Sequence, residues 1–227
     1  MMGLDHSPLI ATDYLAYYID PANRRSYIGS GITINGLVSG NGGSLVNGVG
    51  FGSTGTNYFI FDGVDDGIPF YVPNSGTTMT LEGWIKIKST SNGMIFGFNL
   101  YDVWVNTGRL GYNTAVSDIY GLTSTQVTNL NLLNQWNHYV FEMRSDVSYS
   151  NNKIYINGQN QSLSQVTGTE SASNRNFNSG NGRIACWLYS NSFFLNMDIG
   201  SFKIYNRALS SSEVLQNYNA SKGRYGL

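Results

Sequence analysis

Short runs of alternating hydrophobic and polar residues recur along the chain, and clusters of Gly, Asn, Asp and Ser separate them. This period-two pattern with turn residues between the runs is typical of antiparallel strands joined by hairpins and loops. We therefore predict an all-β chain with strands over residues 14–20, 58–61, 67–72, 79–87, 94–98, 102–106, 136–143, 153–156, 183–189, 193–199 and 201–205.

The segment 79–87 shows the alternation most clearly. Its residues divide between two faces, with Met79, Leu81, Ile85 and Ile87 on one and Thr80, Glu82, Trp84 and Lys86 on the other. Because one set is apolar and the other largely polar, the pattern predicts a sheet with one face buried and the other facing solvent.

Local signals predict a hairpin, a helix and two loops. The strand 153–156 runs into Asn157-Gly158, the dipeptide that best tolerates the positive φ angles of a tight hairpin turn. Residues 210–213 form a capping box, and Val214, Leu215 and Tyr218 follow on one helical face, which predicts a short C-terminal helix. Segments 145–151 and 167–182 lack periodicity, so we expect exposed loops there.

The chain is expected to form a single domain. Residues 1–50 contain several breakers, including Gly40-Asn41-Gly42-Gly43, yet their apolar residues require burial, so we interpret them as a first strand and a clasp over the sheets. Residues 51–209 then form the core of the sandwich, and residues 210–227 form the helix and tail packed on it. A length of 227 residues suits one large β-sandwich.

Composition excludes several classes of function. Lys and Arg number 13 against 14 Asp and Glu, and charged residues make up only 12% of the chain. So few basic side chains argue against nucleic acid or an anionic membrane surface as a partner. The lone Cys186 lies in an apolar run, so an intrachain disulfide is impossible and a buried, inert thiol is expected.

Four motifs follow one another along the chain: FIFDGVDD at 59–66, LEGWI at 81–85, WNHYV at 136–140 with IYING at 154–158, and the run 199–209 with IYNRALS at 204–210. In this order and at this spacing they resemble the LamG-like branch of the concanavalin A-like lectin and glucanase superfamily. The resemblance covers nearly the whole chain. It implies two large antiparallel sheets packed as a jelly-roll sandwich.

The two ends of the chain carry a finer resemblance. YYID at 17–20, SYIGSG at 26–31, SGNG at 39–42 and LVNG at 45–48 are similar to a version of the domain common in tailed bacteriophages, and so is the end 214–227. Those phage proteins are virion components. Residues 1–11 also lack the basic region and apolar core of a signal peptide, so we expect synthesis in a host cytoplasm and a final location in the virion.

No catalytic pair is apparent. Glycanases of this superfamily use two carboxylates on one strand that point to the same face. Asp198 has no acidic partner two or four residues away, and Gly200 and Ser201 stand where many relatives carry the acidic pair. His138 lacks a Ser, Cys or metal-type partner at a recognisable spacing, so we expect a hydrogen-bonded structural residue. The chain is therefore predicted not to be an enzyme, with no catalytic residues and no cofactor.

The acidic cluster of Asp62, Asp65 and Asp66 allows two interpretations. Clustered Asp residues in a loop supply oxygen ligands to calcium in some relatives, but Asp62-Gly63 is also an ordinary turn. We favour the turn, without a metal, because no fourth ligand is evident.

Exposed aromatic side chains beside Asn or Asp are typical of sugar-binding surfaces, since the C–H faces of sugars stack on aromatic rings. Two segments fit, and they supply the candidates Tyr101, Asp102, Trp104, Trp187, Tyr189 and Asn191. An aromatic residue in a strand packs in the core more often than on the surface, so both interpretations stay open.

Three hypotheses of function follow. The first is a bacteriophage virion structural protein, a capsid decoration or a tail or fibre component, whose partners are other virion proteins, copies of itself and a host-surface glycan. The second is a carbohydrate-binding module of a secreted or surface protein. The third, a glycoside hydrolase, receives the least support because the carboxylate pair is missing.

Overall fold

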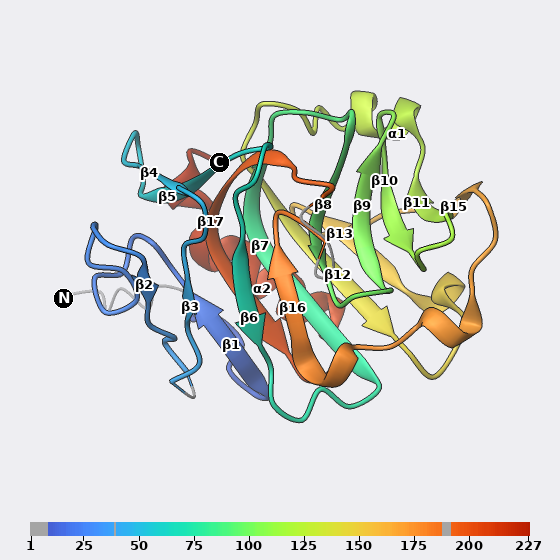
Figure 1. The fold of residues 1–227 in the computed structure, drawn as a ribbon, viewed down its shortest axis with the longest axis horizontal. Helices are drawn as coiled ribbons and strands as arrows, with labels where there is room; N and C mark the ends of the chain where they lie inside the picture. The colour runs from blue at the N-terminus through green and yellow to red at the C-terminus, as the bar shows by residue number, and fades with distance from the viewer. Residues whose placement is uncertain (1–8, 39, 188–191) are drawn as a thin grey trace, which may run out of the picture.

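The chain forms two antiparallel sheets packed face to face, as Figure 1 shows for the computed structural model. The structure describes residues 9–38, 40–187 and 192–227. The predicted all-β sandwich with a C-terminal helix is confirmed. No helix in these ranges is long and apolar enough to cross a membrane.

Sheet I contains eight strands in the order β14-β13-β12-β7-β17-β5-β4, and β1 pairs with the half of β17 that β5 leaves free. Its strands are β1 (Leu15–Ile19), β4 (Gly50–Gly52), β5 (Tyr58–Asp62), β7 (Thr78–Ile87), β12 (Asn137–Arg144), β13 (Lys153–Ile156), β14 (Gln159–Asn160) and β17 (Asn196–Tyr205).

Sheet II contains seven strands in the order β15-β11-β10-β9-β8-β16-β6. They are β6 (Ile68–Tyr71), β8 (Asn92–Gly97), β9 (Asp102–Asn106), β10 (Arg109–Asn113), β11 (Ile119–Leu122), β15 (Ser164–Thr167) and β16 (Asn181–Ile184). Outside both sheets lie the pair β2 (Thr33–Ile34) and β3 (Gly43–Ser44), the helices α1 (Ser124–Asn129) and α2 (Ser211–Ser221), and four 3₁₀ turns over Tyr149–Asn151, Ala172–Asn174, Asn178–Gly180 and Lys222–Tyr225.

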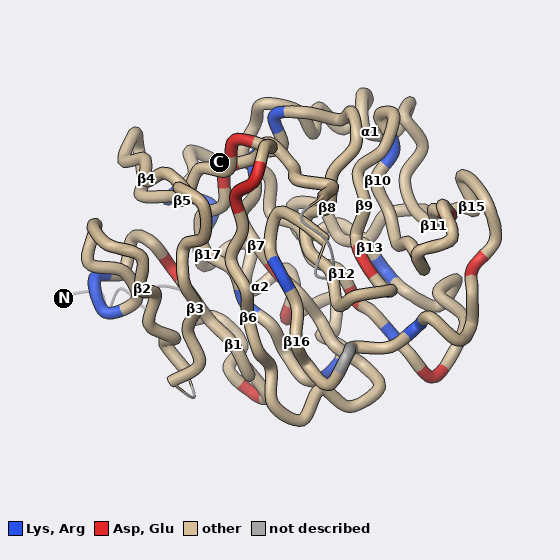
Figure 2. The backbone as a smooth tube through the Cα atoms, in the orientation of Figure 1, with Lys and Arg blue, Asp and Glu red and all other residues tan. Residues whose placement is uncertain are grey.

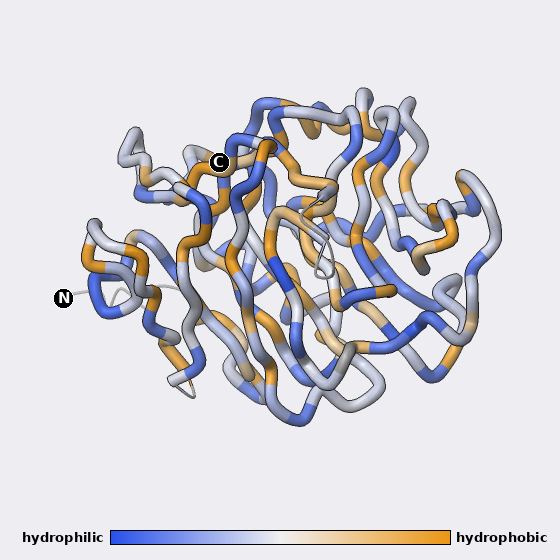
Figure 3. Tube along the Cα trace, in the orientation of Figure 1, coloured by the Kyte–Doolittle hydropathy of each residue, from blue (hydrophilic) through white to orange (hydrophobic). Residues whose placement is uncertain are grey.

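The core lies between the two sheets. Phe96 of sheet II is fully buried there and packs its ring 5.3 Å from that of Phe141 and 6.1 Å from that of Phe202, both of sheet I. Such tilted and edge-on ring contacts are the arrangement that the aromatic quadrupole favours. Figure 3 shows the hydrophobic segments running along the strands of both sheets.

The predicted solvent-facing side of sheet I is wrong. Trp84 and Glu82 on the outer face of β7 are 0% exposed. The cause is the C-terminal segment, which lies on the outer face of sheet I behind β7 in Figure 1. The indole nitrogen of Trp84 donates to the Ser221 hydroxyl at 2.8 Å, and its ring stacks 4.2 Å from that of Tyr225. Alternation within one strand cannot reveal a helix that docks from elsewhere in the chain.

A buried polar cluster, which we name the Glu82 cluster, joins sheet I to α2. It consists of Glu82, Lys203, His138 and Asn217, all at most 2% exposed. Lys203 Nζ and Asn217 Nδ2 donate to the two carboxylate oxygens of Glu82 at 2.5 and 2.6 Å, and His138 Nε2 lies 3.2 Å from Oε1. His138 is thus a buried structural residue, held against a carboxylate.

The charge of Glu82 makes folding sensitive to acid. Burial alone would raise the pKa of Glu82, but Lys203 and His138 beside it lower it to about 2, from an ordinary value of 4.5. Because the folded chain holds this carboxylate ionised more firmly than the unfolded chain, its contribution to stability is present above pH 4.5 and is lost as the pH falls towards 2.

We therefore predict that urea denaturation midpoints separate wild type from Glu82→Gln widely at neutral pH and narrowly at about pH 3. An equal separation at both pH values would show that the charge of Glu82 does not stabilise the fold.

Both ends of the described chain are fastened to the outer face of sheet I. The backbone N–H of Ala11 donates to Asn217 Oδ1 at 2.7 Å, and the Tyr205 hydroxyl donates to the carbonyl of Ala11. The guanidinium of Arg224 forms two hydrogen bonds, of 2.6 and 2.7 Å, with the carboxylate of Asp20. Residues at opposite ends of the sequence therefore cover this face together.

Several local predictions are confirmed and others are wrong. The hairpin between β13 and β14 turns at Asn157-Gly158, both with positive φ, and the capping box between Ser210 and Glu213 is formed. Leu215, however, is 42% exposed, because Asn217 rather than Leu215 faces the sheet. Segments 193–199 and 201–205 belong largely to one strand, β17, with a register irregularity between Ile199 and Phe202.

Candidate functional site

The outer face of sheet II carries the site that the sequence pointed to. Along β9, Val103 and Val105 point into the core, so alternation directs Asp102 and Trp104 to the outer face. Trp104 packs there in a small cluster with Met94 and Ile119, separate from the main core. The helix and chain ends lie over sheet I (Figure 1), whereas Trp187 and Phe193 pack over this part of sheet II and leave Trp104 7% exposed.

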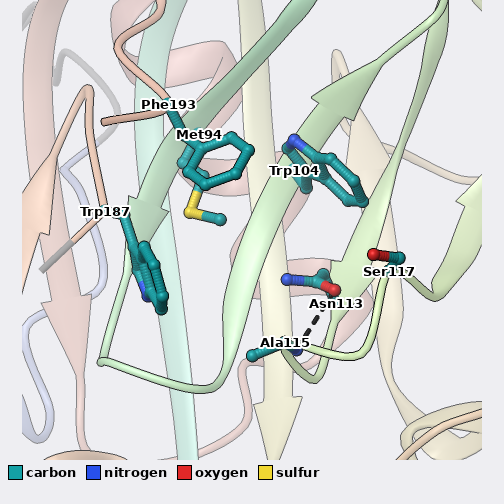
Figure 4. A pocket seen from close by; sticks show the side chains of 7 residues that line it. All are labelled: Met94, Trp104, Asn113, Ala115, Ser117, Trp187 and Phe193. Atoms are coloured by element: carbon teal, nitrogen blue, oxygen red, sulfur yellow. Dashed lines mark hydrogen bonds between the residues drawn. The ribbon is translucent and has the colours of Figure 1, made fainter. Parts of the chain in front are cut away.

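A hollow of about 140 Å³ opens on this face. Figure 4 shows the indoles of Trp104 and Trp187 on opposite sides of it, with Met94 and Phe193 at one end and Asn113 and Ala115 at the other. The described residues that line it are Met94, Trp104, Asn113, Ala115, Ser117, Trp187 and Phe193. Drug-sized sites typically measure about 300–1,000 Å³, so this pocket suits one small ring or substituent.

The aromatic walls of the pocket are held in place by their own contacts. The indole nitrogen of Trp104 donates to Asn92 Oδ1 at 2.8 Å, and that of Trp187 donates to the carbonyl of Asn99. The ring of Phe193 lies edge-on to both indoles, at 6.0 Å from Trp104 and 5.8 Å from Trp187. Walls fixed before a ligand arrives lower the entropy that binding costs.

The polar side of the pocket is small. Asn113 Oδ1 accepts the backbone N–H of Ala115 at 3.1 Å, which fixes the orientation of the amide. The amide nitrogen points into the hollow in Figure 4 and makes no hydrogen bond of standard geometry with the residues described. Asn113 therefore offers a donor to a ligand.

Three residues that line the pocket have strained backbone conformations. Ala115, Ser117 and Phe193 have φ of 60°, 61° and 57°, in the left-handed region that side chains other than glycine avoid. Each such residue costs on the order of 1–3 kcal/mol, and strained residues cluster at functional sites. Three of the seven described lining residues are strained in this way, and ten other non-glycine residues in the described ranges also have positive φ.

Asp102 lies beneath the pocket rather than on its wall. It stands opposite Asn113 in the pairing of β9 with β10 and is 0% exposed. Neither carboxyl oxygen has a hydrogen bond of standard geometry within the described ranges. Burial raises the pKa of Asp102 well above its usual range; the Asn113 amide opposes this, and the Asp118 carboxylate adds to it.

The six residues predicted to contact a sugar lie in different places in the structure. Trp104 and Trp187, 83 positions apart in the sequence, meet across the pocket, and Asp102 lies below it. Tyr101 is buried between the sheets, where its ring stacks on that of Phe177, so it is a core residue. Tyr189 and Asn191 lie outside the described residues. The sequence prediction missed Asn113 and Phe193, which no local motif marks.

The acidic cluster is compact. Ligand oxygens of Asp62, Asp65 and Asp66 lie within 4.8 Å of one another, so these residues could share one cation. The turn predicted for Asp62 is present, since its carboxylate accepts the N–H of Val64 at 2.7 Å, and Asp66 in turn accepts the N–H of Asp62 at 3.0 Å.

At Gly200 and Ser201, where the family resemblance suggests looking for an acidic pair, a side chain from the C-terminal turn fills the space. An added Cβ at Gly200 would lie 2.1 Å from the Tyr225 hydroxyl oxygen, which accepts the backbone N–H of Ser201 at 3.1 Å. Asp198 nearby pairs with Lys86 and Lys88. A tyrosine from the C-terminal turn thus occupies this place.

This contact gives a prediction for stability. Gly200→Ala should lower the free energy of unfolding by about 1–3 kcal/mol, because the new methyl group forces Tyr225 out of its place. Gly223→Ala is the matched control, since nothing lies within 4 Å of the Cβ that it would add. Equal denaturation midpoints for the two variants would contradict the contact.

A second hollow of about 210 Å³ lies at the other sheet, lined in part by Trp136, Arg224 and Tyr225. Its charged groups are already engaged: Arg224 binds Asp20 and Thr56, and the Lys86 ammonium lies 5.9 Å from the Trp136 ring centre. The pocket between Trp104 and Trp187 is therefore the better candidate.

A comparison with models of protein families gives a match over most of the chain. Residues 54–215 match the model described as the concanavalin A-like lectin/glucanases superfamily. A comparison with curated proteins finds no significant match.

Solved structures show the same fold. A Trypanosoma rangeli sialidase aligns with 94% of this chain at a TM-score of 0.65 and 16% identity. The receptor binding domain of a botulinum neurotoxin C/D mosaic aligns with 90% at 0.60 and 12% identity, and the botulinum neurotoxin serotype D ligand binding domain, solved with N-acetylneuraminic acid, with 91% at 0.60 and 13% identity. The chain spans about half the length of the neurotoxin structures and a third of the sialidase.

Proposed function

Since the chain belongs to the concanavalin A-like lectin/glucanase superfamily, we propose that it is a carbohydrate-binding domain whose site is the pocket between Trp104 and Trp187. The observation that carries the proposal is the pair of fixed indoles on the outer face of sheet II, with the Asn113 amide between them (Figure 4). Two aromatic planes hold the apolar faces of a sugar, and an amide beside them bonds its oxygens.

The neighbouring structures support this proposal in a limited way. One of them, the serotype D ligand binding domain, is solved in complex with an acidic sugar. The protein in that complex shares this fold over about half of its length. At 13% identity the two proteins share only the fold. The sugar and the position of the site must therefore be argued from the residues of this chain.

We propose that the pocket binds without hydrolysing. Retaining and inverting glycosidases need two carboxyl groups about 5–9.5 Å apart on either side of the bond that is cleaved. No residue among those described at the pocket carries an exposed carboxyl group, and Asp102 beneath it is 0% exposed. Release of reducing sugar from a bound glycan would contradict this part.

The test of the proposal is a glycan array probed with the intact, labelled chain. We expect binding to a small subset of glycans, and competition by the same glycans free in solution. Trp187→Ala should weaken this binding. A chain that is folded by circular dichroism but binds no glycan above background would refute the proposed function.

A second candidate, compatible with the first, is a structural role in a bacteriophage virion as a capsid decoration or a tail or fibre component. The observation that favours it is the similarity of residues 17–48 and 214–227 to phage versions of the domain. Immunogold labelling of purified particles with an antibody against the chain tests it. Labelled particles would support the role, and particles free of label would refute it.

A further inference from the structure

Most hydrogen-bonding groups around the pocket are already engaged within the protein. Both indole N–H groups are already used, that of Trp104 by Asn92 and that of Trp187 by Asn99. The polar groups left at the described wall are the Asn113 amide nitrogen and the Ser117 hydroxyl. Of these, the Asn113 amide nitrogen points into the hollow, so one of its two N–H groups can donate to a ligand while the amide keeps its contact with Asp102.

The Ser117 hydroxyl is the side-chain acceptor that remains for a ligand on the described wall. Asn113 Oδ1 already accepts the Ala115 N–H, and the Asp102 carboxyl is buried below the floor. Each hydroxyl of a plain hexose brings a donor as well as acceptor lone pairs, and a donor buried without an acceptor costs free energy. The pocket is therefore poorly suited to enclose several hydroxyl groups.

An acetamido group adds two features that a hydroxyl group does not have. Its carbonyl oxygen can accept a hydrogen bond from Asn113 Nδ2, and its methyl group suits the apolar end formed by Met94 and Phe193 (Figure 4). Its single N–H donor takes the place of the hydroxyl donor, and the Ser117 hydroxyl on the wall can accept it. The volume of about 140 Å³ also fits a substituent better than an extended oligosaccharide. The ring that bears the group can then stack on the indoles.

The charge around the pocket excludes acidic versions of such a sugar. No Lys or Arg is among the described residues that line it. The carboxyl groups of Asp102 and Asp118 lie behind the floor, and Asp118 accepts hydrogen bonds from Thr114. A sugar carboxylate would therefore lose its water without gaining a cation.

We propose that the pocket selects a neutral N-acetylhexosamine, with the acetamido carbonyl on Asn113 Nδ2 and the methyl group against Met94 and Phe193. This inference rests on the proposed glycan-binding function. It adds to that function the chemical class of the ligand and the residue that selects it.

The test compares two matched pairs of methyl glycosides, N-acetylglucosaminide with glucoside and N-acetylgalactosaminide with galactoside, by calorimetry on the intact chain. Members of a pair differ only at carbon 2. In at least one pair we expect the acetamido member to bind about tenfold more tightly, the worth of one buried hydrogen bond. Saturation-transfer NMR should show its strongest signal on the acetyl methyl group.

A variant isolates the donor. Asn113→Asp keeps the oxygen that accepts the Ala115 N–H but removes the amide N–H, so the preference within a pair should fall to about one. Asn160→Asp on the exposed edge strand β14 makes the same chemical change away from the pocket and should leave the preference intact. The wild-type comparison stands by itself if Asn113→Asp fails to fold.

The outcomes separate the two proposals. Equal or tighter binding of the plain glycosides would overturn the acetamido inference and leave glycan binding intact, as would array hits that lack N-acetyl groups. Absence of binding to all four glycosides and to every glycan on the array would overturn the proposed function itself.

Discussion

Lys203→Met is expected to destabilise the fold by about 3–5 kcal/mol, the usual cost of removing one partner of a buried ion pair. Lys203 is 2% exposed, and its ammonium lies 2.5 Å from the carboxylate of Glu82, which is fully buried. Without the ammonium, Glu82 must either bear an uncompensated charge or take up a proton. Chemical denaturation monitored by tryptophan fluorescence measures the loss.

A double variant and a control define the cause. Combining Lys203→Met with Glu82→Gln should cost less than the sum of the single changes, because no buried charge is left alone. Arg144→Met breaks the exposed pair of Arg144 with Asp146, at 36% and 38% exposure, and should shift the midpoint little. A loss for Lys203→Met as small as that for Arg144→Met would refute the importance of the Glu82 cluster.

Trp187→Ala is expected to weaken glycan binding about thirtyfold, since truncating a central Trp of a binding site typically costs about 2 kcal/mol. Trp187 is half-buried and forms one wall of the pocket, so the exposed part of its ring can contact the ligand. Titration calorimetry with the best ligand from the array measures the change, and thermal unfolding checks that the variant remains folded.

Trp136→Ala is the matched control for this prediction. Trp136 is also half-buried and lies beside a hollow, but at the other sheet. We expect its loss to leave glycan binding within about twofold of wild type. If both substitutions weakened glycan binding equally, or if only Trp136→Ala weakened it, the assignment of the site to sheet II would be contradicted.

The alternation of apolar and polar residues was sufficient to predict the sandwich, because inward-facing residues such as Leu81 and Val103 build a common core. It was not sufficient for β10 and β11. Gly111 and Gly121 stand opposite each other in these strands, where an added Cβ at Gly111 would lie 2.4 Å from the carbonyl of Tyr120. The two backbones approach so closely that glycine is required at both positions. In a sequence, however, glycine usually indicates a turn, so these two strands were not predicted.

The site could be predicted only in part. The aromatic segments pointed to Trp104 and Trp187, but strand parity, not composition, decided that Tyr101 faces the core while Trp104 faces outward. The contact between β9 and the segment after β16 depends on the tertiary fold. The left-handed backbone of Ala115 and Phe193 likewise arises from the folded loops, so their sequence does not mark it.

The two outer faces of the sandwich differ: the one on sheet I carries stabilising contacts, and the one on sheet II carries the proposed binding pocket. On sheet I, both chain ends lie over the strands, and a buried ion pair fastens α2 to them. On sheet II, the described residues Trp187 and Phe193 pack over Trp104, and the fixed aromatic pocket opens between them. Figure 2 shows charged residues thinly scattered over the described chain, so the pocket must act through shape and hydrogen bonds rather than through a charged surface.

The most direct test of the pocket uses the four tryptophan indole N–H signals, which NMR resolves one by one. Two of them belong to the pocket, Trp104 and Trp187, while Trp84 is buried under α2 and Trp136 lies at sheet I. Titration of a bound glycan should shift the signals of Trp104 and Trp187 and leave those of Trp84 and Trp136 in place. A shift at Trp136 with unchanged signals from Trp104 and Trp187 would contradict the assignment of the site.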